Sequence, residues 1–363
     1  MKVVDGTEAS KDELTPIFGE RGIPVAFFAD RNYFPYVAVA VRSIVETASP
    51  EKAYDVLVFT DADVRPSIRE RFLDETRGCP NVSLRLVVLS ATDLADVSGL
   101  FAGALSAMTY GRLLLPTLLA NYRRAIYLDV DIVVREDLGS LFEIDLQGNS
   151  VGAVGDGGIV RCPMTPRWRE AILNVCPDFD FGPYVNAGVL LMDLDGLRRE
   201  RSMPCCLDLA ARNRFVLCDQ DALNICLRNR ILQLPRRWNQ CTNALPYSVF
   251  DGAPDVLGTR TGIVHYTGEK PWQRYRSDSP DWMWRDVASR TSYYQEFTLA
   301  LARATSSLFV HARFVDLLRL WILSRDENRK ARGKHPFLFL PASWLAEWRE
   351  KLMRRGLLSR LSA

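Results

Sequence analysis

The chain has 363 residues, of which 48% are hydrophobic and 25% charged, so it has the make-up of an ordinary globular protein with room for two or three domains. A formal net charge of +2 indicates no preference for nucleic acid, and we expect no such partner. No apolar run is long enough to span a bilayer, residues 1–20 contain no signal-peptide core, and the eight cysteines form no Cys-x-x-Cys pair, so we expect a cytoplasmic protein with reduced thiols.

The N-terminal part alternates between strand and helix patterns. After a polar leader at residues 1–22, predicted to have little structure, short apolar runs alternate with stretches whose apolar residues recur at helical spacing. The expected strands are residues 23–29, 54–60 and 82–89, and the expected helices are residues 34–46 and 66–76. This order predicts a parallel sheet with helices on both faces, and such sheets bind ligands at the carboxyl ends of their strands. No Gly-x-Gly-x-x-Gly motif follows the first strand, which argues against a dinucleotide site of the usual kind.

Residues 124–134 form an apolar run interrupted by Asp129 and Asp131. If this run is one buried strand, the two carboxylates point to the same side. Two neighbouring carboxylates repel each other and lose hydration, so they need a compensating partner, for which a divalent cation is the usual choice. Solvated aspartates at a strand end are the plainer alternative. Arg112, just upstream, is suited either to pairing with a carboxylate or phosphate or to a solvated helix face.

Further strands and helices follow the aspartate run. Strands are expected at residues 151–154, ending near Asp156, and at residues 184–192, with a loop-rich segment at 157–183 between them. A helical stretch is expected to about residue 212, and Asp219-Gln220-Asp221 then leads into another helix, whose first turn these acidic residues also suit. The α/β part ends near Trp272, after which the pattern becomes helical. We therefore expect a leader at 1–22, a catalytic domain at 23–275 and a helical region at 276–363.

Taken in order, these motifs resemble glycosyltransferase family 8, and within it bacterial lipopolysaccharide α-galactosyl- and α-glucosyltransferases. The resemblance covers residues 23–275 and rests on six pieces. They are Ala29-Asp30 with Asn32-Tyr33, Tyr110 with Arg112, Asp129-x-Asp131, Asn186-Ala187-Gly188-Val189-Leu190-Leu191, Asp219-Gln220-Asp221, and His265-x-x-Gly268 with Lys270-Pro271-Trp272. It implies a fold of GT-A type, a Rossmann-like mixed sheet flanked by helices, with a C-terminal helical extension.

The resemblance also implies a UDP-sugar donor, UDP-galactose or UDP-glucose, and a saccharide acceptor of a lipopolysaccharide or other cell-surface glycan. Asp129, Asp131 and His265 would hold a divalent cation, and the imidazole favours Mn²⁺ over Mg²⁺, which remains usable. Lys270 and Gly268 would contact the diphosphate. The remaining expected donor-site residues are Ala29, Asp30, Asn32 and Tyr33 for uracil and ribose, together with Val130, Arg112, Asn186 and Asp219.

The family transfers the sugar with retention of the α configuration, and the resemblance places Gln220 at the reacting centre. An amide is a poor nucleophile, so we favour attack by the acceptor hydroxyl on the face that the leaving group departs from. Gln220 would then stabilise the cationic transition state through its carbonyl dipole, with Asp219 beside it. Asp156 would lie on the acceptor side.

The C-terminal tail has a different character. Residues 331–363 contain seven Lys or Arg and two Glu, a net charge of +5, with Trp344, Trp348 and several leucines among them. A basic helix with tryptophans suits an anionic membrane surface, so we expect peripheral attachment to the inner face of a membrane and a lipid-linked saccharide acceptor. A helix packed on its own domain is the alternative.

Two other functions fit parts of the sequence. A phosphohydrolase of the haloacid dehalogenase type also uses an apolar strand ending in Asp-x-Asp. Resemblance to that group, however, would require a residue with a hydroxyl group, such as threonine, two positions after the second aspartate, where this chain has Val133. A non-catalytic protein that binds nucleotide sugars or glycans would share all the expected ligands.

Overall fold

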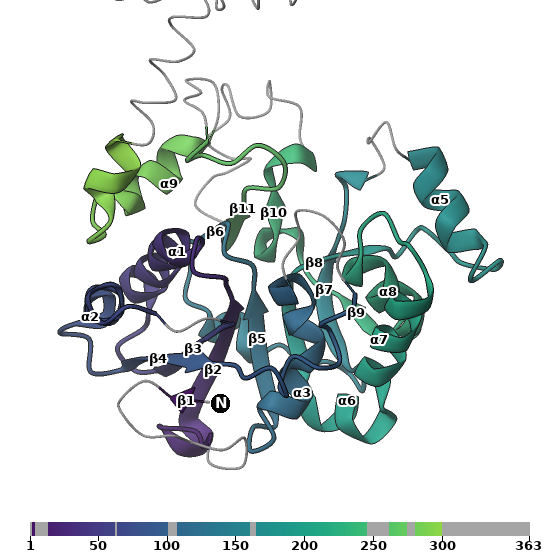
Figure 1. Ribbon diagram of the computed structural model, residues 1–363, viewed down its shortest axis with the longest axis horizontal. Helices are drawn as coiled ribbons and strands as arrows, with labels where there is room; N and C mark the ends of the chain where they lie inside the picture. Colours follow the sequence, from purple (N-terminus) through teal and green to yellow (C-terminus); the bar gives the residue numbers. More distant parts are fainter. Residues whose placement is uncertain are drawn as a thin grey trace, which may run out of the picture. The chain divides into compact units, whose positions relative to one another are not determined.

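A mixed sheet forms the centre of the molecule (Figure 1). The computed structural model describes residues 2–3, 14–61, 64–100, 107–159, 165–244, 261–273 and 280–299. Within these ranges, one sheet has eight strands in the order β1-β4-β3-β2-β5-β8-β7-β9. Their bounds are Lys2–Val3 (β1), Gly22–Phe28 (β2), Ala53–Thr60 (β3), Val82–Val88 (β4), Arg124–Leu128 (β5), Val151–Gly155 (β7), Val185–Asp193 (β8) and Ile231–Gln233 (β9).

The strand directions divide this sheet into two parts. Strands β4, β3, β2 and β5 are parallel, as the alternation of strands and helices predicted. Strand β8 is antiparallel to both β5 and β7, and β1 is antiparallel to β4 at the edge. The expected Rossmann-like mixed sheet is therefore confirmed.

Helices cover both faces of the sheet, which explains why its strands are apolar along their whole length. In β2, Val25 and Phe27 belong to one apolar layer, whereas Ala26 and Phe28 belong to the other. The first layer is completed by α1 (Phe34–Thr47), α2 (Pro66–Leu73) and α4 (Gly139–Phe142). The second is completed by α3 (Leu115–Leu118), α6 (Leu194–Glu200), α7 (Ser202–Arg212) and α8 (Asp219–Cys226).

The run at residues 124–134 is not one strand, and that prediction is wrong. β5 ends at Leu128, and β6 (Ile132–Val134) belongs to a second sheet with β11 (Ile263–His265) and β10 (Gln240–Cys241). The chain between them is tied to both sheets, because the Asp129 N–H donates to the Gly188 carbonyl and the Tyr266 N–H donates to the Asp131 carbonyl, each at 2.8 Å. The break sits where carboxylates interrupt the apolar run, and it carries the chain from one sheet to the other.

Three further segments differ from expectation. The loop-rich segment contains a helix, α5 (Thr165–Leu173), and the helical stretch before residue 212 is divided at Arg201, whose φ is +55°. The expected leader is partly built into the fold, since Lys2–Val3 forms β1 and Leu14 is buried. After the α/β part comes α9 (Asp281–Ala288). Its Trp284 lies in an apolar cluster that also includes Val39 of α1.

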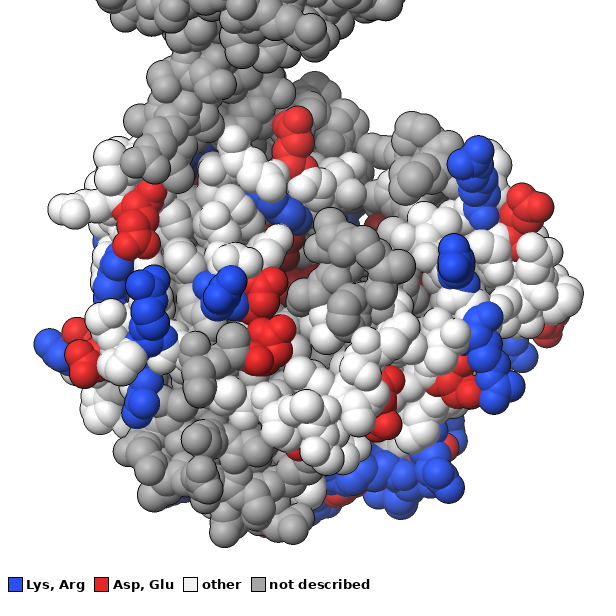
Figure 2. Space-filling view, viewed as in Figure 1, with Lys and Arg blue, Asp and Glu red and all other residues white. Residues whose placement is uncertain are grey.

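The basic tail at residues 331–363 lies outside the described residues, and the domain division at residue 275 stays a prediction. Of the helices in the described ranges, none has the length and apolar character to cross a membrane. The seven cysteines in those ranges are free thiols, as expected. Figure 2 shows acidic and basic side chains interspersed over the described part of one face, in keeping with the small net charge.

Candidate functional site

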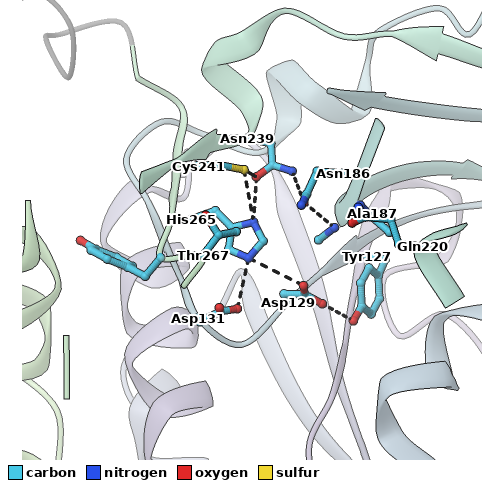
Figure 3. Close-up of polar contacts among 12 residues, drawn as sticks. Tyr127, Asp129, Asp131, Asn186, Ala187, Gln220, Asn239, Cys241, His265 and Thr267 are labelled. Atoms are coloured by element: carbon cyan, nitrogen blue, oxygen red, sulfur yellow. Dashed lines mark hydrogen bonds and ion pairs between the residues drawn. The ribbon is translucent and has the colours of Figure 1, made fainter. Parts of the chain in front are cut away.

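Three side chains with metal-binding chemistry meet where the chain passes from the central sheet to the small one. Asp129 and Asp131 lie in the connection between β5 and β6, and His265 ends β11, paired with Ile132 of β6. One ligand atom of each lies within 4.8 Å of the other two. His265 Nε2 is 3.3 Å from Asp131 Oδ1 and 3.7 Å from Asp129 Oδ2 (Figure 3). The connection, rather than strand alternation, brings the predicted ligands together.

Gly188 of β8 forms one wall of this cluster. A Cβ atom on Gly188 would lie 2.2 Å from His265 Cε1 and 2.7 Å from Asp129 Oδ2, so only glycine lets the β8 backbone pass here. Two carboxylates and one imidazole form a suitable donor set for a divalent cation. The donor set and the space that Gly188 leaves both fit such an ion.

Positive charges compensate the carboxylate of Asp131. The ammonium group of Lys270 donates hydrogen bonds to Asp131 Oδ2 and, at 2.9 Å, to the carbonyl of Tyr266. Burial alone would raise the pKa of Asp131, but the charges of His265 and Lys270 outweigh it and hold that pKa well below its ordinary value. Burial alone would lower the pKa of His265, and Asp131 outweighs it and raises the pKa to about 10.

Arg112 joins this cluster to a second buried acid. Its guanidinium makes ion pairs with Asp129 Oδ1 at 3.2 Å and Asp219 Oδ2 at 2.8 Å, and it lies over the ring of Tyr127, 4.7 Å from the centroid. Arg112 is buried, so the solvated-face alternative is wrong. Burial raises the pKa of Asp219 to about 6; Arg112 opposes this shift, and Asp129 adds to it.

A cavity of about 320 Å³ opens beside these groups at the carboxyl end of β2 and β5. It is lined by Phe28, Ala29, Asp30, Tyr33, Met108, Thr109, Arg112, Tyr127, Asp129, Val130, Asp131 and Lys270. Eight of the residues predicted for the donor or the metal are among them. Asn32 is not among the lining residues; its backbone N–H donates to Asp30 Oδ1 at 2.8 Å and so closes the turn that carries Asp30. Gly268 is also outside the lining, two residues before Lys270, with a φ of +85°.

An irregularity in β8 releases backbone groups that side chains of the site then bind. The register between β8 and β7 shifts just after Asn186. The Ala187 N–H donates to Gln220 Oε1 at 3.0 Å, and the Gly188 N–H donates to Asn186 Oδ1 at 2.9 Å. The two amide nitrogens in turn donate to Asp156 Oδ2, Asn186 at 3.1 Å and Gln220 at 3.0 Å. Bulges of this kind often aim side chains at functional sites, and this one unites Asn186, Gln220 and Asp156.

The Asp219-Gln220-Asp221 trio serves two purposes, as both sequence interpretations allowed. The carboxylate of Asp221 accepts hydrogen bonds from Trp168 at 2.8 Å, from the Tyr184 hydroxyl at 2.5 Å and from the Leu217 N–H at 2.8 Å. These contacts anchor the first turn of α8. Asp219 and Gln220, in the same turn, face the site.

Sequence reasoning missed two residues that touch the predicted ligands. The Tyr127 hydroxyl donates to Asp129 Oδ1 at 2.6 Å, and Asn239 Oδ1 lies 2.9 Å from His265 Nδ1. Tyr127 precedes the Asp-x-Asp pair by two positions, and this spacing was a usable signal. Asn239 follows a 3₁₀ helix at Arg236–Trp238, and no pattern in the sequence marked it.

The residues of this site lie within a region that matches a known protein family. The sequence model for glycosyl transferase family 8 matches residues 24–276. The chain is 28% identical over 257 residues to General stress protein A of Bacillus subtilis (strain 168), a match covering 67% of this chain and 85% of that protein. It is 24% identical over 282 residues to the lipopolysaccharide 1,2-glucosyltransferase of Escherichia coli (strain K12), covering 75% and 79%.

Solved structures show the same fold. The galactosyltransferase LgtC, in complex with donor and acceptor sugar analogs, matches with a TM-score of 0.59 and 25% identity. That match covers 74% of this chain and 96% of LgtC. The GT-A type of sheet expected from the sequence is therefore confirmed.

Proposed function

This chain belongs to glycosyltransferase family 8, and from that membership we propose that it moves a hexose, galactose or glucose, from a UDP-sugar to a saccharide acceptor. The product would keep the α configuration of the donor. The acceptor would be a lipopolysaccharide or another cell-surface glycan, because relatives of this chain include a lipopolysaccharide glucosyltransferase. The assignment to a glycosyltransferase family removes the phosphohydrolase alternative.

One observation carries the proposal. The ligand atoms of Asp129, Asp131 and His265, within 4.8 Å of one another, lie beside a cavity of about 320 Å³ that also contains Lys270. These three residues would hold a divalent cation, Mn²⁺ in preference to Mg²⁺ because of the imidazole. When bound, the cation would supply positive charge for the diphosphate as the bond to the sugar breaks.

The cavity residues would divide the donor between them. Ala29, Asp30 and Tyr33 would seat the uracil and ribose, and the half-exposed ring of Tyr33 offers a stacking surface. Asn32 supports this proposal indirectly, through its backbone bond to Asp30. Val130 would border the ribose. Lys270, with Gly268 in a left-handed conformation two residues before it, would reach the diphosphate.

Residues of β8 and α8 would hold the sugar and its reacting carbon. Arg112, Asp219 and Asn186 would bind sugar hydroxyls. Gln220 Oε1 accepts one hydrogen bond from Ala187, and its second lone pair remains to face developing positive charge. Asp156 fixes this orientation by accepting from the amide nitrogen of Gln220.

Asp156 supports a position for the acceptor. It lines a second cavity, of about 300 Å³, with Trp168, Phe181 and Tyr184. Aromatic walls beside a carboxylate suit a saccharide, because rings pack against its apolar face and carboxylates accept from its hydroxyls. The Gln220 amide, bonded to Asp156, would then lie between donor and acceptor.

We also propose that the protein works in the cytoplasm, attached peripherally to the inner face of a membrane. The basic tail with Trp344 and Trp348 supports this proposal, as does the net charge of +5 over residues 331–363. A lipid-linked acceptor would be reached from such a position.

Hydrolysis of UDP-galactose and UDP-glucose, with Mn²⁺ or with a chelator, tests the proposal. A transferase without acceptor should release UDP slowly, and only with the metal present. The Asp131→Asn variant should keep its fold, checked by circular dichroism, and lose this activity. Release that survives exhaustive chelation would contradict the metal-dependent mechanism, and a complete lack of UDP release would favour the non-catalytic binding protein.

A further inference from the structure

We propose that Asn239 is a positioning residue: it fixes which ring nitrogen of His265 faces the metal site and ties that choice to the orientation of Asn186. Asn239 is 2% exposed and follows the 3₁₀ helix at Arg236–Trp238. Its side chain lies between His265 and Asn186, as Figure 3 shows. The inference rests on the metal site of the proposed function.

The direction of the hydrogen bonds is set at one end by the backbone. The Gly188 N–H, which can only donate, lies 2.9 Å from Asn186 Oδ1. That side-chain atom must therefore be the oxygen. The other end of the same amide then donates to Asp156 Oδ2 at 3.1 Å, and a carboxylate accepts such a bond. The orientation of Asn186 thus follows from its two partners.

The orientation of Asn239 follows from that of Asn186. Asn239 Nδ2 lies 2.8 Å from Asn186 Oδ1, so it must be the donor, and Asn239 Oδ1 must face His265 Nδ1 at 2.9 Å. An amide oxygen only accepts, so the proton of the ring is on Nδ1. A histidine that ligates a metal is neutral, and a neutral ring with its proton on Nδ1 has its lone pair on Nε2, the nitrogen 3.3 Å from Asp131 Oδ1.

Few other groups near His265 Nδ1 can accept a hydrogen bond from it. The sulfur of Cys241 lies 4.0 Å from Nδ1, and a thiol is a weak acceptor. Without Asn239, the ring could carry its proton on either nitrogen and turn more freely. Groups that orient a ligating histidine typically contribute a factor of about 10 to 100 to metal affinity.

The same amide has a second partner, which makes the two contacts separable. A carboxylate at position 239 keeps the acceptor for His265 Nδ1. It removes the donor for Asn186 Oδ1 and places a carboxylate oxygen beside that atom, where Asn239 Nδ2 now donates at 2.8 Å, so the two oxygens repel each other. Asn239→Asp should therefore preserve the metal site and disturb the Asn186 and Asp156 side, whereas Asn239→Ala should disturb both.

The experiment measures Mn²⁺ affinity in the absence of nucleotide, by electron paramagnetic resonance of the free ion, and then steady-state donor hydrolysis. Asn239→Ala should raise the Kd for Mn²⁺ about 10- to 100-fold. Asn239→Asp should keep the Kd within about threefold and lower the kcat of hydrolysis about tenfold or more, because the buried hydrogen bond to Asn186 is replaced by repulsion between two oxygens. Asn81→Ala is the matched control, because its amide donates to the carbonyls of Ser49 and Lys52, both at 3.0 Å, away from the site.

Ring nitrogen shifts give a direct view of the tautomer. The chain has three histidines, so ¹⁵N-histidine spectra of the Mg²⁺-loaded protein can be assigned with a His265 variant. The wild type should show a protonated Nδ1, and Asn239→Ala should lose that signature.

The outcomes separate the inference from its premise. A wild type that binds no Mn²⁺ would show the proposed metal site to be wrong, and the inference falls with it. If the wild type binds Mn²⁺ and Asn239→Ala binds it equally well, this inference alone is overturned. It is also overturned if Asn81→Ala loses as much affinity as Asn239→Ala, or if Asn239→Asp weakens Mn²⁺ binding as Asn239→Ala does.

Discussion

The ammonium group of Lys270 is bonded to the Asp131 carboxylate, the same group that would ligate a metal ion. Lys270 also donates to the carbonyl of Tyr266 at 2.9 Å, so it is held in this position from two sides. In this arrangement the lysine supplies the positive charge that a cation would otherwise bring. A metal ion bound here would therefore compete with the lysine for Asp131 until a diphosphate offered Lys270 another partner.

Replacing Lys270 should accordingly have opposite effects on two ligands. With Lys270→Met, Mn²⁺ should bind about tenfold more tightly without nucleotide, because a unit charge about 4 Å away is worth up to about 4 kcal/mol at an effective dielectric constant of 20 and the lysine can partly swing aside. UDP should bind more weakly. Isothermal titration with each ligand measures both effects, and Lys270→Arg is the charge-preserving control. Weaker Mn²⁺ binding by Lys270→Met would contradict the competition.

Gly188 gives a steric test of the proposed metal site. In Gly188→Ala the new methyl group would lie 2.2 Å from His265 Cε1 and 2.7 Å from Asp129 Oδ2, so both side chains must move. We expect Mn²⁺ affinity to fall at least about tenfold, as for other changes that displace a ligating group. Gly155→Ala in β7 is the control, because its nearest neighbour would be at an ordinary 3.5 Å. Equal affinity in the two variants would show that Gly188 does not shape the cluster.

Much of this arrangement was predictable from the sequence, and the reasons are local. Apolar runs such as 23–29 and 54–60 predicted strands correctly, because strands of a sheet that is covered on both faces are apolar along their whole length. The proximity of Asp129 and Asp131 was expected from their spacing, although the connection between β5 and β6 produces it and not a continuous strand. The break between β5 and β6 was not predictable, because Ile132–Val134 is as apolar as the strand before it. Asn239 could not be found because its partners, Asn186 and His265, are far from it in sequence.

The raised pKa of Asp219 predicts a dependence of stability on pH. Folding raises this pKa from 3.8 to about 6, so between these values the folded chain holds the proton more tightly than the unfolded chain does. The stabilising contribution is fully present below about pH 4 and is lost as the pH rises through 6. A shift of about two units corresponds to about 3 kcal/mol.

Urea unfolding of the wild type and Asp219→Asn between pH 4 and 7, with chelator present, measures this contribution. Asparagine does not titrate, so the difference in unfolding free energy, wild type minus variant, isolates the carboxyl group. We expect that difference to fall as the pH rises. A difference in unfolding free energy that stays level, or increases, would mean that burial does not raise the pKa of Asp219.

The basic tail can be tested separately from the chemistry. Deleting the residues after 340 should reduce co-sedimentation with vesicles that contain anionic lipid, because each basic residue near such a surface contributes about 1 kcal/mol. The attraction should weaken with salt, since exposed charges are screened within about 8 Å at physiological ionic strength. Hydrolysis of the soluble donor should be unchanged. Equal vesicle binding by the full and shortened chains would show that the tail is part of the fold's own packing.

Gln220 should matter for the rate more than for donor binding. Its Oε1 accepts from the Ala187 N–H at 3.0 Å and its nitrogen donates to Asp156 at 3.0 Å, so the amide is held before any substrate arrives. A group oriented in advance acts on charge that develops in the transition state, and its removal lowers kcat with little change in KM. We expect Gln220→Ala to lower kcat about 100-fold or more, as loss of one such stabilising group does.

The stereochemistry of the product provides the second half of this test. Attack from the face of the departing diphosphate keeps the α configuration without a covalent sugar–enzyme intermediate. Proton NMR of the first product formed from UDP-galactose or UDP-glucose should therefore show an α linkage, for the wild type and for the residual turnover of Gln220→Ala alike. Because an amide at position 220 is not needed as a nucleophile in this mechanism, the variant should be slow but not altered in outcome. A β linkage from the wild type would refute retention, and an inverted product from the variant alone would show that Gln220 attacks the sugar directly.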